Sequence, residues 1–587
     1  MTWTLGIAAS HDASAVLFRD GSLVAAIAEE RLTRIKGDGG RLPGRAIDAV
    51  LEAGGIGRGD VDHLALIAGR LPDTYVRRPT FWRELERRLS RFRRRLAGAP
   101  PRATSMVNLQ KMLRRRGLDT TLEPWLRRTR FLKGEGFRSD ATVRFFDHHH
   151  THAILGAFYS GFEEAAVITM DGEGDLDIHH TSSVYRRNTL ELRHLTDAPG
   201  TSAGGFYMHV TALLGFRPLR HEGKVLGLAA FGNPEPLSTA FARALRRGCD
   251  GRTLDSDFRG LDRAEARRRD YVRELVKGHP REDVAAAAQK VLEDAVVPLV
   301  EGFVAETGIP QVALNGGVFA NVKLNQRIAA LAGVERIFVF PGMSDTGNSL
   351  GAALLRLEEL EPGFLERGRH ELASVYWGPA YADDEMEAAL KTAGLPYRRL
   401  EREALVETAG QAIQAGRVVG WFQGRMEFGP RALGNRSIVA RATEAAVNRW
   451  LNDRLNRTEF MPFAPTVLGE HAAEIFQGVE RACHPAEFMT VTFDVRREWR
   501  ARIPAVVHVD GTARPQLLFR EKNPLYYDLI ERYRQLSGIP VVLNTSFNVH
   551  EEPIVCAPAE AVAALAEDRI DCLALGPFWV GGARPPR

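Results

Sequence analysis

The stretch from Asp147 to Asp171 carries the residue types best suited to metal binding in this chain. It reads DHHHTHA, then small and apolar residues, then AAVITMDGEGD. His148 and His152 are four positions apart, so on a helix they share one face, about one turn apart. Asp171 follows the β-rich run 165–170 and begins a glycine-rich turn, where a carboxylate can face a helix packed on that strand. Two imidazoles and a carboxylate predict a divalent metal site. The alternative is that the histidines are surface-polar or bond to one another.

Two more aspartates lie in turns that follow short apolar segments. Asp12 lies in SHDAS near the N-terminus, and Asp345 lies in a turn before a helix of small residues. Between them, the strand 311–314 leads into NGGVFAN. There Gly316 and Gly317 allow backbone amides to approach a phosphate or an adenosine, and the next helix offers its N-terminus. Three acidic strand-end turns together with the histidine pair predict one ligand-binding centre.

The segments 5–34 and 165–195 repeat one pattern weakly. Each reads as a strand, an acidic turn, a second strand, a hairpin turn at 19–21 or 186–188, and a third strand. A duplicated unit of this kind predicts two related α/β halves that face each other across a cleft. Ligands of such folds gather at the carboxyl ends of strands, where both acidic turns lie.

Length and composition limit the class of protein. A chain of 587 residues is too long for one hydrophobic core, so two or three domains are expected. With 44% hydrophobic and 26% charged residues, and no uninterrupted apolar run of about 18 residues, we expect a globular protein without a membrane span. The start MTWTLGIAASHD lacks a charged n-region and a cleavage site and predicts a strand. A cytoplasmic location fits the four cysteines, which are widely spaced and form no metal-type pair: Cys249, Cys483, Cys556 and Cys572.

The segment 77–138 is strongly basic. It holds 19 Lys and Arg against 5 Asp and Glu, a net charge of +14, whereas the whole chain carries +4. Such a segment is either a nucleic-acid surface or a solvated, arginine-rich helical insertion. The second interpretation is favoured because apolar residues recur at helical spacing, which predicts a packed amphipathic helix: Leu85, Leu89, Phe92 and Leu96. Nucleic acid is therefore not expected as a partner.

Many ordered motifs resemble those of the O-carbamoyltransferases of the NodU/CmcH type, which modify nodulation factors, cephalosporins, aminoglycosides and polyketide antibiotics. The N-terminal motifs are HDAS, DHHHTHA, MDGEGD, HEGKVLGLAAFG, LNGGVFAN and SDTGNSLGAAL. The C-terminal motifs are GWFQGRMEFGPRALGNRSIVA, RTEFMPFAP, DGTARPQ and NTSFNV. The resemblance spans nearly the whole chain and covers the basic segment least.

The resemblance implies an α/β protein of two domains. Residues 1–365 correspond to a duplicated actin/hexokinase-like (ASKHA) carbamoyl-transfer domain, into which the basic helical segment 77–138 is inserted. Residues 380–587 correspond to an α/β YrdC-like domain that forms carbamoyl adenylate. The basic insertion lies between the two half-domains and contains aromatic residues. This suggests the further hypothesis that the insertion forms part of the acceptor pocket.

The resemblance also implies a metal centre and an acceptor site. The family's metal ligands, usually reported to hold iron, fall on His148, His152, Asp171 and Asp345. His11 and Asp12 match the residues beside the acceptor hydroxyl. A neutral imidazole accepts a hydroxyl proton near pH 7, so His11 is a candidate general base. The alternative is that His11 is a turn residue that caps the next element.

The remaining site residues are expected to bind the nucleotide and the carbamoyl donor. The adenylate is expected at Gly223, Lys224, Gly316, Gly317 and Asn321, although Lys224 is equally interpreted as a surface lysine at a helix start. Carbamoyl phosphate and ATP need bidentate donors, hydroxyls and amides in strand-end turns. The residues of that kind are Arg431, Arg436, Arg457, Arg514, Asn544, Thr545 and Ser546. Taken singly, each arginine is more often a surface salt-bridge partner, but its place in a glycine-flanked turn next to an apolar strand favours a ligand.

One motif departs from the family pattern. Where many members read KxRExFRPFAP, this chain reads LNRTEFMPFAP. Arg457 is therefore assigned the role of the family's lysine, and Met461 replaces an arginine.

The implied reaction has two halves. Carbamoyl phosphate loses phosphate, and the carbamate attacks the α-phosphate of ATP, which Mg²⁺ neutralises, to give carbamoyl adenylate and pyrophosphate. A hydroxyl of a small-molecule natural product, an antibiotic or a glycan, then attacks the carbonyl and AMP leaves. The metal, Fe²⁺ by family, favours that departure. The sequence does not identify the acceptor, and it permits a homodimer.

Two other functions agree with part of the sequence. Shared folds and the basic insertion suggest a tRNA threonylcarbamoyladenosine-type modification enzyme, but the domain order and the small-molecule type of motif argue against it. A sugar-kinase-like ATPase or an actin-like assembly protein would not need the histidine pair or an arginine-rich second domain.

Overall fold

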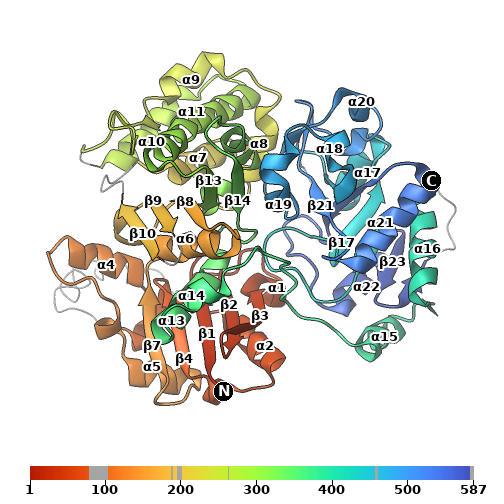
Figure 1. Cartoon of the computed structure of the whole chain (residues 1–587), viewed down its shortest axis with the longest axis horizontal. Helices are drawn as coiled ribbons and strands as arrows, with labels where there is room; N and C mark the ends of the chain where they lie inside the picture. Colours follow the sequence, from red (N-terminus) through yellow and green to blue (C-terminus); the bar gives the residue numbers. More distant parts are fainter. Residues whose placement is uncertain (78–102, 187–188, 195–200, 262, 457–459, 582–587) are drawn as a thin grey trace, which may run out of the picture.

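The computed structural model describes residues 1–77, 103–186, 189–194, 201–261, 263–456 and 460–581. Two N-terminal sheets, with the helices around them, form one part of the molecule, and the third large sheet forms the other (Figure 1). Within these residues, no helix is long and apolar enough to cross a membrane. The mixed α/β class expected from the sequence is confirmed.

The first sheet has the strand order β3-β2-β1-β4-β7. Its antiparallel hairpins join β1 to β2 and β2 to β3, whereas β4 runs parallel to both β1 and β7. All six residues of β1 are buried, as expected for a central strand covered by helices on both faces. The bounds are β1 (Trp3–Ala8), β2 (Ser14–Arg19), β3 (Ser22–Ala28), β4 (His63–Ile67) and β7 (Thr142–Phe146).

The second sheet repeats this topology with the order β10-β9-β8-β13-β14. Its two hairpins are again antiparallel, and β13 again runs parallel to its two neighbours. The predicted duplication is therefore confirmed in strand order and direction. The bounds are β8 (Glu164–Met170), β9 (His180–Arg186), β10 (Thr189–His194), β13 (Gln311–Asn315) and β14 (Arg336–Val339).

Two helices lie between these sheets: α6 (His148–Tyr159) and α13 (Asn348–Leu360) (Figure 1). α6 packs on β8 and β13, α13 packs on β1 and β4, and the two helices pack on each other. Gly351 permits this close approach, because a Cβ at that position would overlap the carbonyl oxygen of Thr151. The packing brings the first turn of α6 next to the residues that precede α13.

Further helices cover the outer faces. The second sheet is covered by α7 (Ala203–Leu213), α8 (Glu222–Ala229), α9 (Glu235–Phe241), α10 (Ala264–Leu275), α11 (Arg281–Thr307) and α12 (Val322–Ala329). α2 (Gly44–Gly54) packs on β2 and β3, and α1 (Glu29–Thr33) extends β3 toward the C-terminal part. α14 (Phe364–Gly368) follows α13.

The described part of the basic insertion, 103–138, is folded against the first sheet's edge. It contains β6 (Ala103–Ser105), α4 (Met106–Arg114) and α5 (Arg128–Glu135). The strand β6 pairs with β5 (Arg70–Pro72), which precedes the insertion. Met106, Leu109 and Leu113 are buried, so α4 is an amphipathic helix. The apolar stripe expected at 85–96 lies outside the described residues.

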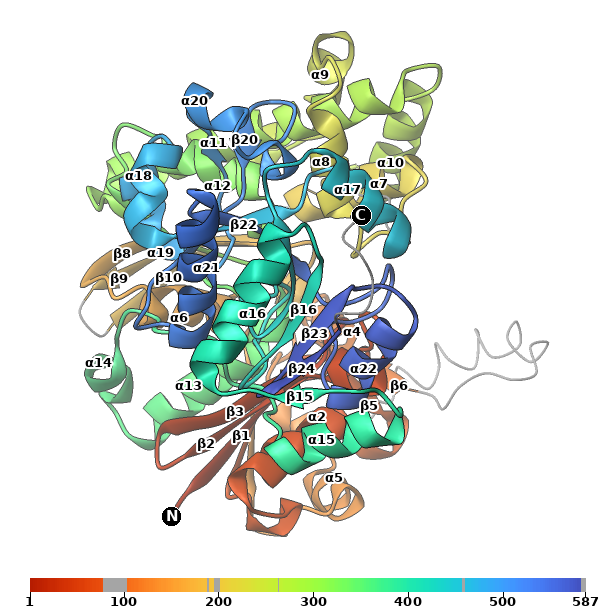
Figure 2. The same cartoon turned by 90° about the vertical axis from the view of Figure 1, so that its right-hand side faces the viewer.

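The C-terminal part is built on an eight-stranded sheet of order β15-β24-β23-β16-β17-β22-β18-β21 (Figure 2). α16 (Arg402–Gln414) packs on α21 (Pro524–Ser537), and α15 (Asp383–Thr392) packs on α22 (Pro558–Ala566). The central strands are β23 (Cys572–Leu575), β16 (Val419–Phe422), β17 (Arg436–Arg441) and β22 (Val541–Ser546). The outer strands are β15 (Arg398–Arg399), β24 (Phe578–Val580), β18 (Ala464–Leu468) and β21 (Gln516–Leu518); α17 (Ala446–Arg454) lies in the β17–β18 connection.

Candidate active site

The histidine pair is held by the first turn of α6. Asp147 is the N-cap of this helix, and its carboxylate accepts a hydrogen bond from the backbone N–H of His150 at 2.9 Å. The helix predicted from the spacing is thus confirmed. The rings of His148 and His152 lie 4.8 Å apart, centroid to centroid, and both side chains are buried.

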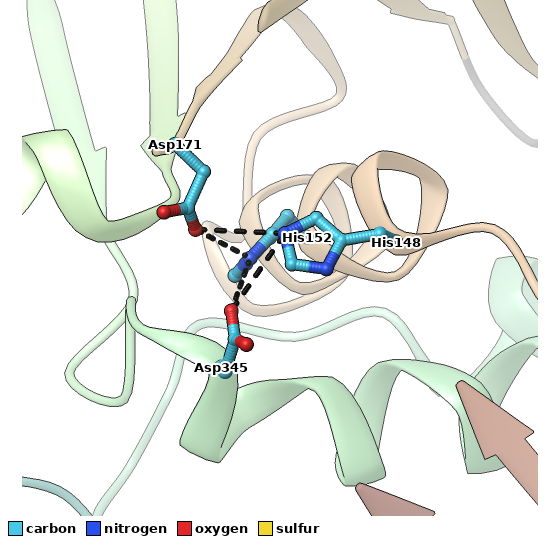
Figure 3. A group of neighbouring side chains, drawn as sticks. All are labelled: His148, His152, Asp171 and Asp345. Carbon is cyan, nitrogen blue, oxygen red and sulfur yellow. Dashed lines mark ion pairs between the residues drawn. The ribbon is translucent and has the colours of Figure 1, made fainter. Parts of the chain in front are cut away.

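Two carboxylates face this pair from different elements (Figure 3). Asp171 follows the last residue of β8, and Asp345 begins the 3₁₀ turn Asp345–Gly347 that leads into α13. His148 Nε2 lies 3.5 Å from Asp171 Oδ2 and 3.7 Å from Asp345 Oδ1. For His152 Nε2 the corresponding distances are 3.3 Å and 3.8 Å. The ligand atoms of all four side chains lie within 4.8 Å of one another.

These four side chains fit a divalent cation. Ligand atoms about 2.1 Å from one ion are about 3.0 Å apart at right angles and about 3.4 Å apart in a tetrahedron, close to the separations found here. Among the described residues, His148 Nε2 and Asp345 Oδ1 are buried without a hydrogen-bond partner. Two imidazole nitrogens and two carboxylates suit Fe²⁺, Zn²⁺ or Mn²⁺.

The charges of the cluster are strongly coupled. Burial alone would lower the pKa of His148, but the carboxylates of Asp345 and Asp171 outweigh it and raise this pKa to about 10. Burial alone would raise the pKa of Asp171, yet the neighbouring imidazoles of His148 and His152 hold this pKa below its usual range. A divalent cation would take over this compensation of charge and leave the imidazoles neutral.

Glycines shape the turn that presents Asp171. The backbone N–H of Gly317 donates to Asp171 Oδ2 at 3.1 Å, and the N–H of Gly172 donates to Oδ1 at 2.6 Å. Gly316 has a φ of 101°, and a Cβ there would overlap the carbonyl oxygen of Met170. Gly316 does not line the cavity described below. The glycine pair assigned to the adenylate therefore serves Asp171 first, and only Gly317 also faces the cavity.

His11 lies on the other side of Asp345. His11 Nδ1 is 3.1 Å from Asp345 Oδ2, and His11 Nε2 is 3.5 Å from Asp12 Oδ2. Burial acts to lower the pKa of His11, but Asp345, Asp12 and Asp171 raise it to about 10. Arg220, which the sequence analysis did not select, donates to Asp12 Oδ1 at 2.9 Å and to the carbonyl of Gly37 at 2.8 Å. The signal for Arg220 was its position directly before HEGKVLG.

A cavity of about 490 Å³ joins the N-terminal and C-terminal parts. Its walls carry most of the residues selected from the sequence, from both parts of the chain. The N-terminal ones are His11, Asp12, Asp171, Gly223, Lys224, Gly317, Asn321 and Asp345; the C-terminal ones are Arg431, Arg514, Asn544, Thr545 and Ser546. His148 and His152 are not in the lining, since they lie behind the two aspartates.

Arg436 is a correction to the predicted donor site. Its side chain is fully buried, does not line the cavity and lies 3.6 Å from the centre of the Phe422 ring. The guanidinium donates to the backbone carbonyls of Gln423, Gly424, Asn435 and Pro379. Arg436 therefore has a structural role. A glycine-flanked turn in the sequence does not distinguish an arginine that binds a ligand from one that holds the backbone. Arg457 lies outside the described residues.

Glu427 is a second residue that the sequence analysis missed. Its buried Oε1 accepts hydrogen bonds from the backbone N–H groups of Leu433, Asn435 and Arg436, at 2.7–3.1 Å. These bonds fix the end of the turn that carries Arg431 toward the cavity. The sequence feature that could have indicated Glu427 is its position in the motif EFGPRALG, in which the sequence analysis selected only Arg431.

Comparison with known proteins gives consistent matches over the chain. Residues 3–354 match the family model described as carbamoyltransferase N-terminus, and residues 410–581 match that of the carbamoyltransferase C-terminus. The nodulation protein NolNO of Sinorhizobium fredii is 33% identical, over 97% of this chain and 79% of that protein. The uncharacterized protein sll1178 of Synechocystis is 31% identical, over 100% of this chain and 98% of that protein. A solved structure of full-length HypF aligns with a TM-score of 0.31 at 13% identity, covering 62% of this chain and 56% of HypF, which is too distant to carry an argument.

Proposed function

Because the chain belongs to the carbamoyltransferase family and is an enzyme of that type, we propose that it is an ATP- and carbamoyl phosphate-dependent O-carbamoyltransferase. It forms carbamoyl adenylate at its C-terminal part and transfers the carbamoyl group to a hydroxyl of a small-molecule natural product. On this proposal the two five-stranded sheets of like topology form the duplicated actin/hexokinase-like core, and the eight-stranded sheet belongs to the YrdC-like domain.

One observation carries the proposal: both sets of side chains line the same cavity. His11 and the aspartates of the metal-type cluster lie on its N-terminal walls, and Arg431 and Arg514 lie on its C-terminal walls. Carbamate and its adenylate react readily with water. A common cavity allows the adenylate to move between the two reactions over a short path within the protein.

The first half-reaction is assigned to the C-terminal walls. Arg431 and Arg514 are suited to bind the phosphoryl oxygens of carbamoyl phosphate, because a guanidinium presents paired donors to an anion. Thr545 and Ser546, at the end of β22, add hydroxyls and backbone amides. Water attacks the phosphorus of carbamoyl phosphate, which releases inorganic phosphate and carbamate. The carbamate oxygen then attacks the α-phosphate of ATP and releases pyrophosphate; Mg²⁺ bound to the triphosphate would neutralise its charge.

The second half-reaction is assigned to the N-terminal walls. With its Nδ1–H directed to Asp345, His11 keeps the lone pair of Nε2 for the proton of the acceptor hydroxyl. Asp12, held by Arg220, lies 3.5 Å from Nε2 and stabilises the imidazolium that forms once His11 has taken this proton. His148, His152, Asp171 and Asp345 would hold a divalent cation, Fe²⁺ by family, which would stabilise the negative charge that develops as AMP leaves and would offset the carboxylates that raise the pKa of His11.

The basic insertion is a weaker candidate for the acceptor pocket than the sequence suggested. None of its described residues, 103–138, lines the cavity. Among the described residues, α7 contributes Tyr207 and Met208 to the N-terminal lining of the cavity.

The test is incubation of the purified protein with ATP, carbamoyl phosphate and a panel of hydroxyl-bearing natural products. We expect AMP and pyrophosphate that depend on carbamoyl phosphate, and a product heavier by one carbamoyl group. Formation of ADP without a requirement for carbamoyl phosphate would instead indicate a sugar-kinase-like enzyme. Consumption of the adenylate only in the presence of tRNA would indicate the threonylcarbamoyladenosine type.

A further inference from the structure

Glu551 is a carboxylate of the C-terminal part that lies in the cavity wall against side chains of the N-terminal part. Its Oε1 is 2.5 Å from His221 Nε2, and its Oε2 is 3.3 Å from a guanidinium nitrogen of Arg217. His550 Nε2 lies 3.5 Å from the same Oε1. His221 and His550 line the cavity as well. Three nitrogen-bearing side chains thus surround one carboxylate where the two parts of the chain meet.

The hydrogen bonds of His221 make its Nε2 a donor. The backbone N–H of Arg217 donates to His221 Nδ1 at 3.2 Å, so the neutral ring carries its hydrogen on Nε2. A metal ion would need the lone pair of Nε2, so this tautomer does not suit a cation, although the spacing of His221, His550 and Glu551 would allow one. The Nε2–H is directed at Glu551, so a ligand that displaced this carboxylate would meet the same N–H.

Glu551 is held in its place at a conformational cost. Its φ is 63°, a left-handed conformation that is strained for a residue with a Cβ. It lies in the turn that follows β22, and its side chain is 38% exposed. A turn changes conformation at a smaller cost than a strand does. The carboxylate can therefore leave the cavity wall when another anion takes over its contacts.

The charges of this wall act in opposite directions on a nucleotide. Burial acts to raise the pKa of Glu551, but the hydrogen bond from His221 and the neighbouring positive groups hold it below its usual range, so the side chain is ionised. Lys224, whose Nζ lies 3.4 Å from His550 Nε2, adds a positive group to the same wall. A carboxylate that stayed among these groups would repel the phosphates of ATP.

The exposure of Arg217 indicates which phosphates would use this site. Its side chain is 61% exposed and still contacts Glu551, so the site reaches the rim of the cavity. The adenylate has to remain inside for the second half-reaction, whereas pyrophosphate has to leave to the solvent. A rim position suits the leaving group.

Resting on the function proposed above, we propose that His221, Arg217 and Lys224 bind the terminal phosphates of ATP, and that Glu551 occupies their site until the nucleotide displaces it. Both a carboxylate and a phosphate present oxygens to the same N–H groups. Occupation by Glu551 lowers the apparent affinity for the nucleotide by the fraction of molecules in which the site is open. After pyrophosphate has left, the returning carboxylate opposes its rebinding.

The test compares the binding of two ligands to the full-length protein by calorimetry. Pyrophosphate with Mg²⁺ probes the terminal phosphates, and AMP probes the part of the nucleotide that remains. Glu551→Gln, which removes the charge and keeps the shape, should lower the dissociation constant of pyrophosphate by about tenfold and change that of AMP by less than about twofold. Glu551→Gly adopts the positive φ without strain and should give the same result even if the glutamine side chain still fills the site.

Two further variants complete the experiment. His221→Ala should raise the dissociation constant of pyrophosphate by about tenfold, because it removes a donor. Glu552→Gln is the matched control and should change neither constant, since Glu552 is the exposed neighbour of Glu551 and does not line the cavity.

Unchanged or weaker binding of pyrophosphate in both Glu551 variants would overturn the inference, because the contact with His221 would then only join the two parts of the chain. The absence of pyrophosphate binding in every variant would overturn it too, as would an equal tightening of AMP. These constants need no turnover. Failure of the proposed function appears separately, as AMP formation that does not depend on carbamoyl phosphate.

Discussion

The two histidines of the metal-type cluster, His148 and His152, differ from the other residues of α6 by facing two carboxylates. His148 is one of them, whereas His150, two residues further along the same helix, lies outside the cluster. His148→Ala should reduce bound divalent metal to a small fraction of one per chain and slow carbamoyl transfer by more than about 100-fold. ATP-dependent adenylate formation should continue, because its residues belong to the C-terminal part. Metal analysis and separate assays of the two half-reactions check this, with His150→Ala as the control. Full transfer by a metal-free variant would contradict the assignment.

The residues of the metal-type cluster could be selected from the sequence, but the surroundings of some other site residues could not be predicted. The spacing of His148 and His152 was sufficient to place both on one helix face. The strand-end position of Asp171 was sufficient to direct it toward them. Arg431 and Arg436, five residues apart in one motif, looked alike in sequence. Only the three-dimensional packing shows that one lines the cavity and the other is enclosed by backbone carbonyls.

The two arginines therefore predict opposite phenotypes. Arg436→Ala leaves several buried carbonyls without a donor, so it should lower the free energy of unfolding by at least about 3 kcal/mol. Arg431→Ala should leave stability nearly unchanged and raise the KM for carbamoyl phosphate by about 10- to 100-fold. Urea unfolding and adenylate-formation kinetics measure the two effects. Equal effects of the two substitutions on stability would contradict the distinction.

At the scale of elements, the basic insertion supports the loop that presents Asp171. α4 packs against the 3₁₀ turn Asp175–Asp177. Lys111 pairs with Glu173 and, at 2.7 Å, with Asp177, and Arg114 donates to the carbonyl of Leu176 at 2.6 Å. Leu176 and Asp177 have positive φ angles, which this bracing holds in place. The sequence indicated that the insertion is helical and basic. It did not indicate that α4 contacts the loop 173–177, because no local pattern records contacts between segments about 60 residues apart.

Lys111 is therefore expected to act on the metal site through the loop. Lys111→Ala should raise the dissociation constant for the divalent metal by about tenfold, as loss of an outer contact does in other metal sites. A competition titration with a chromogenic chelator measures it. Lys133→Ala, at an exposed position of α5 in the same insertion, is the matched control and should have no effect. Unchanged affinity in the Lys111 variant would show that the loop holds its shape without α4.

At the scale of the molecule, the repeated pattern of strands and turns predicted the duplication, and a separate C-terminal domain was expected from the family resemblance alone. Neither predicts which side chains of the two parts face each other across the cavity. The placement of Arg431 opposite His11 depends on contacts between the two parts of the chain, which no local pattern records. α1 makes several of these contacts. Arg31 donates to the carbonyl of Gly429 at 2.8 Å, and Arg34 donates to the carbonyls of Pro553 and Ile554 at 2.8 and 2.7 Å.

Arg34 is thus expected to keep the cavity closed between the half-reactions. Its guanidinium also pairs with Glu560 at 3.3 Å. In the wild type, about one AMP should form for each carbamoylated product, because the adenylate is protected from water. Arg34→Ala should raise this ratio to roughly two or more through hydrolysis of escaping adenylate, while each half-reaction alone keeps its rate. Arg58→Ala is the matched control, since Arg58 makes its hydrogen bonds to Asp48, Glu135 and Gly44 within the N-terminal part. A ratio that stays at one in the Arg34 variant would mean that closure of the cavity does not depend on α1.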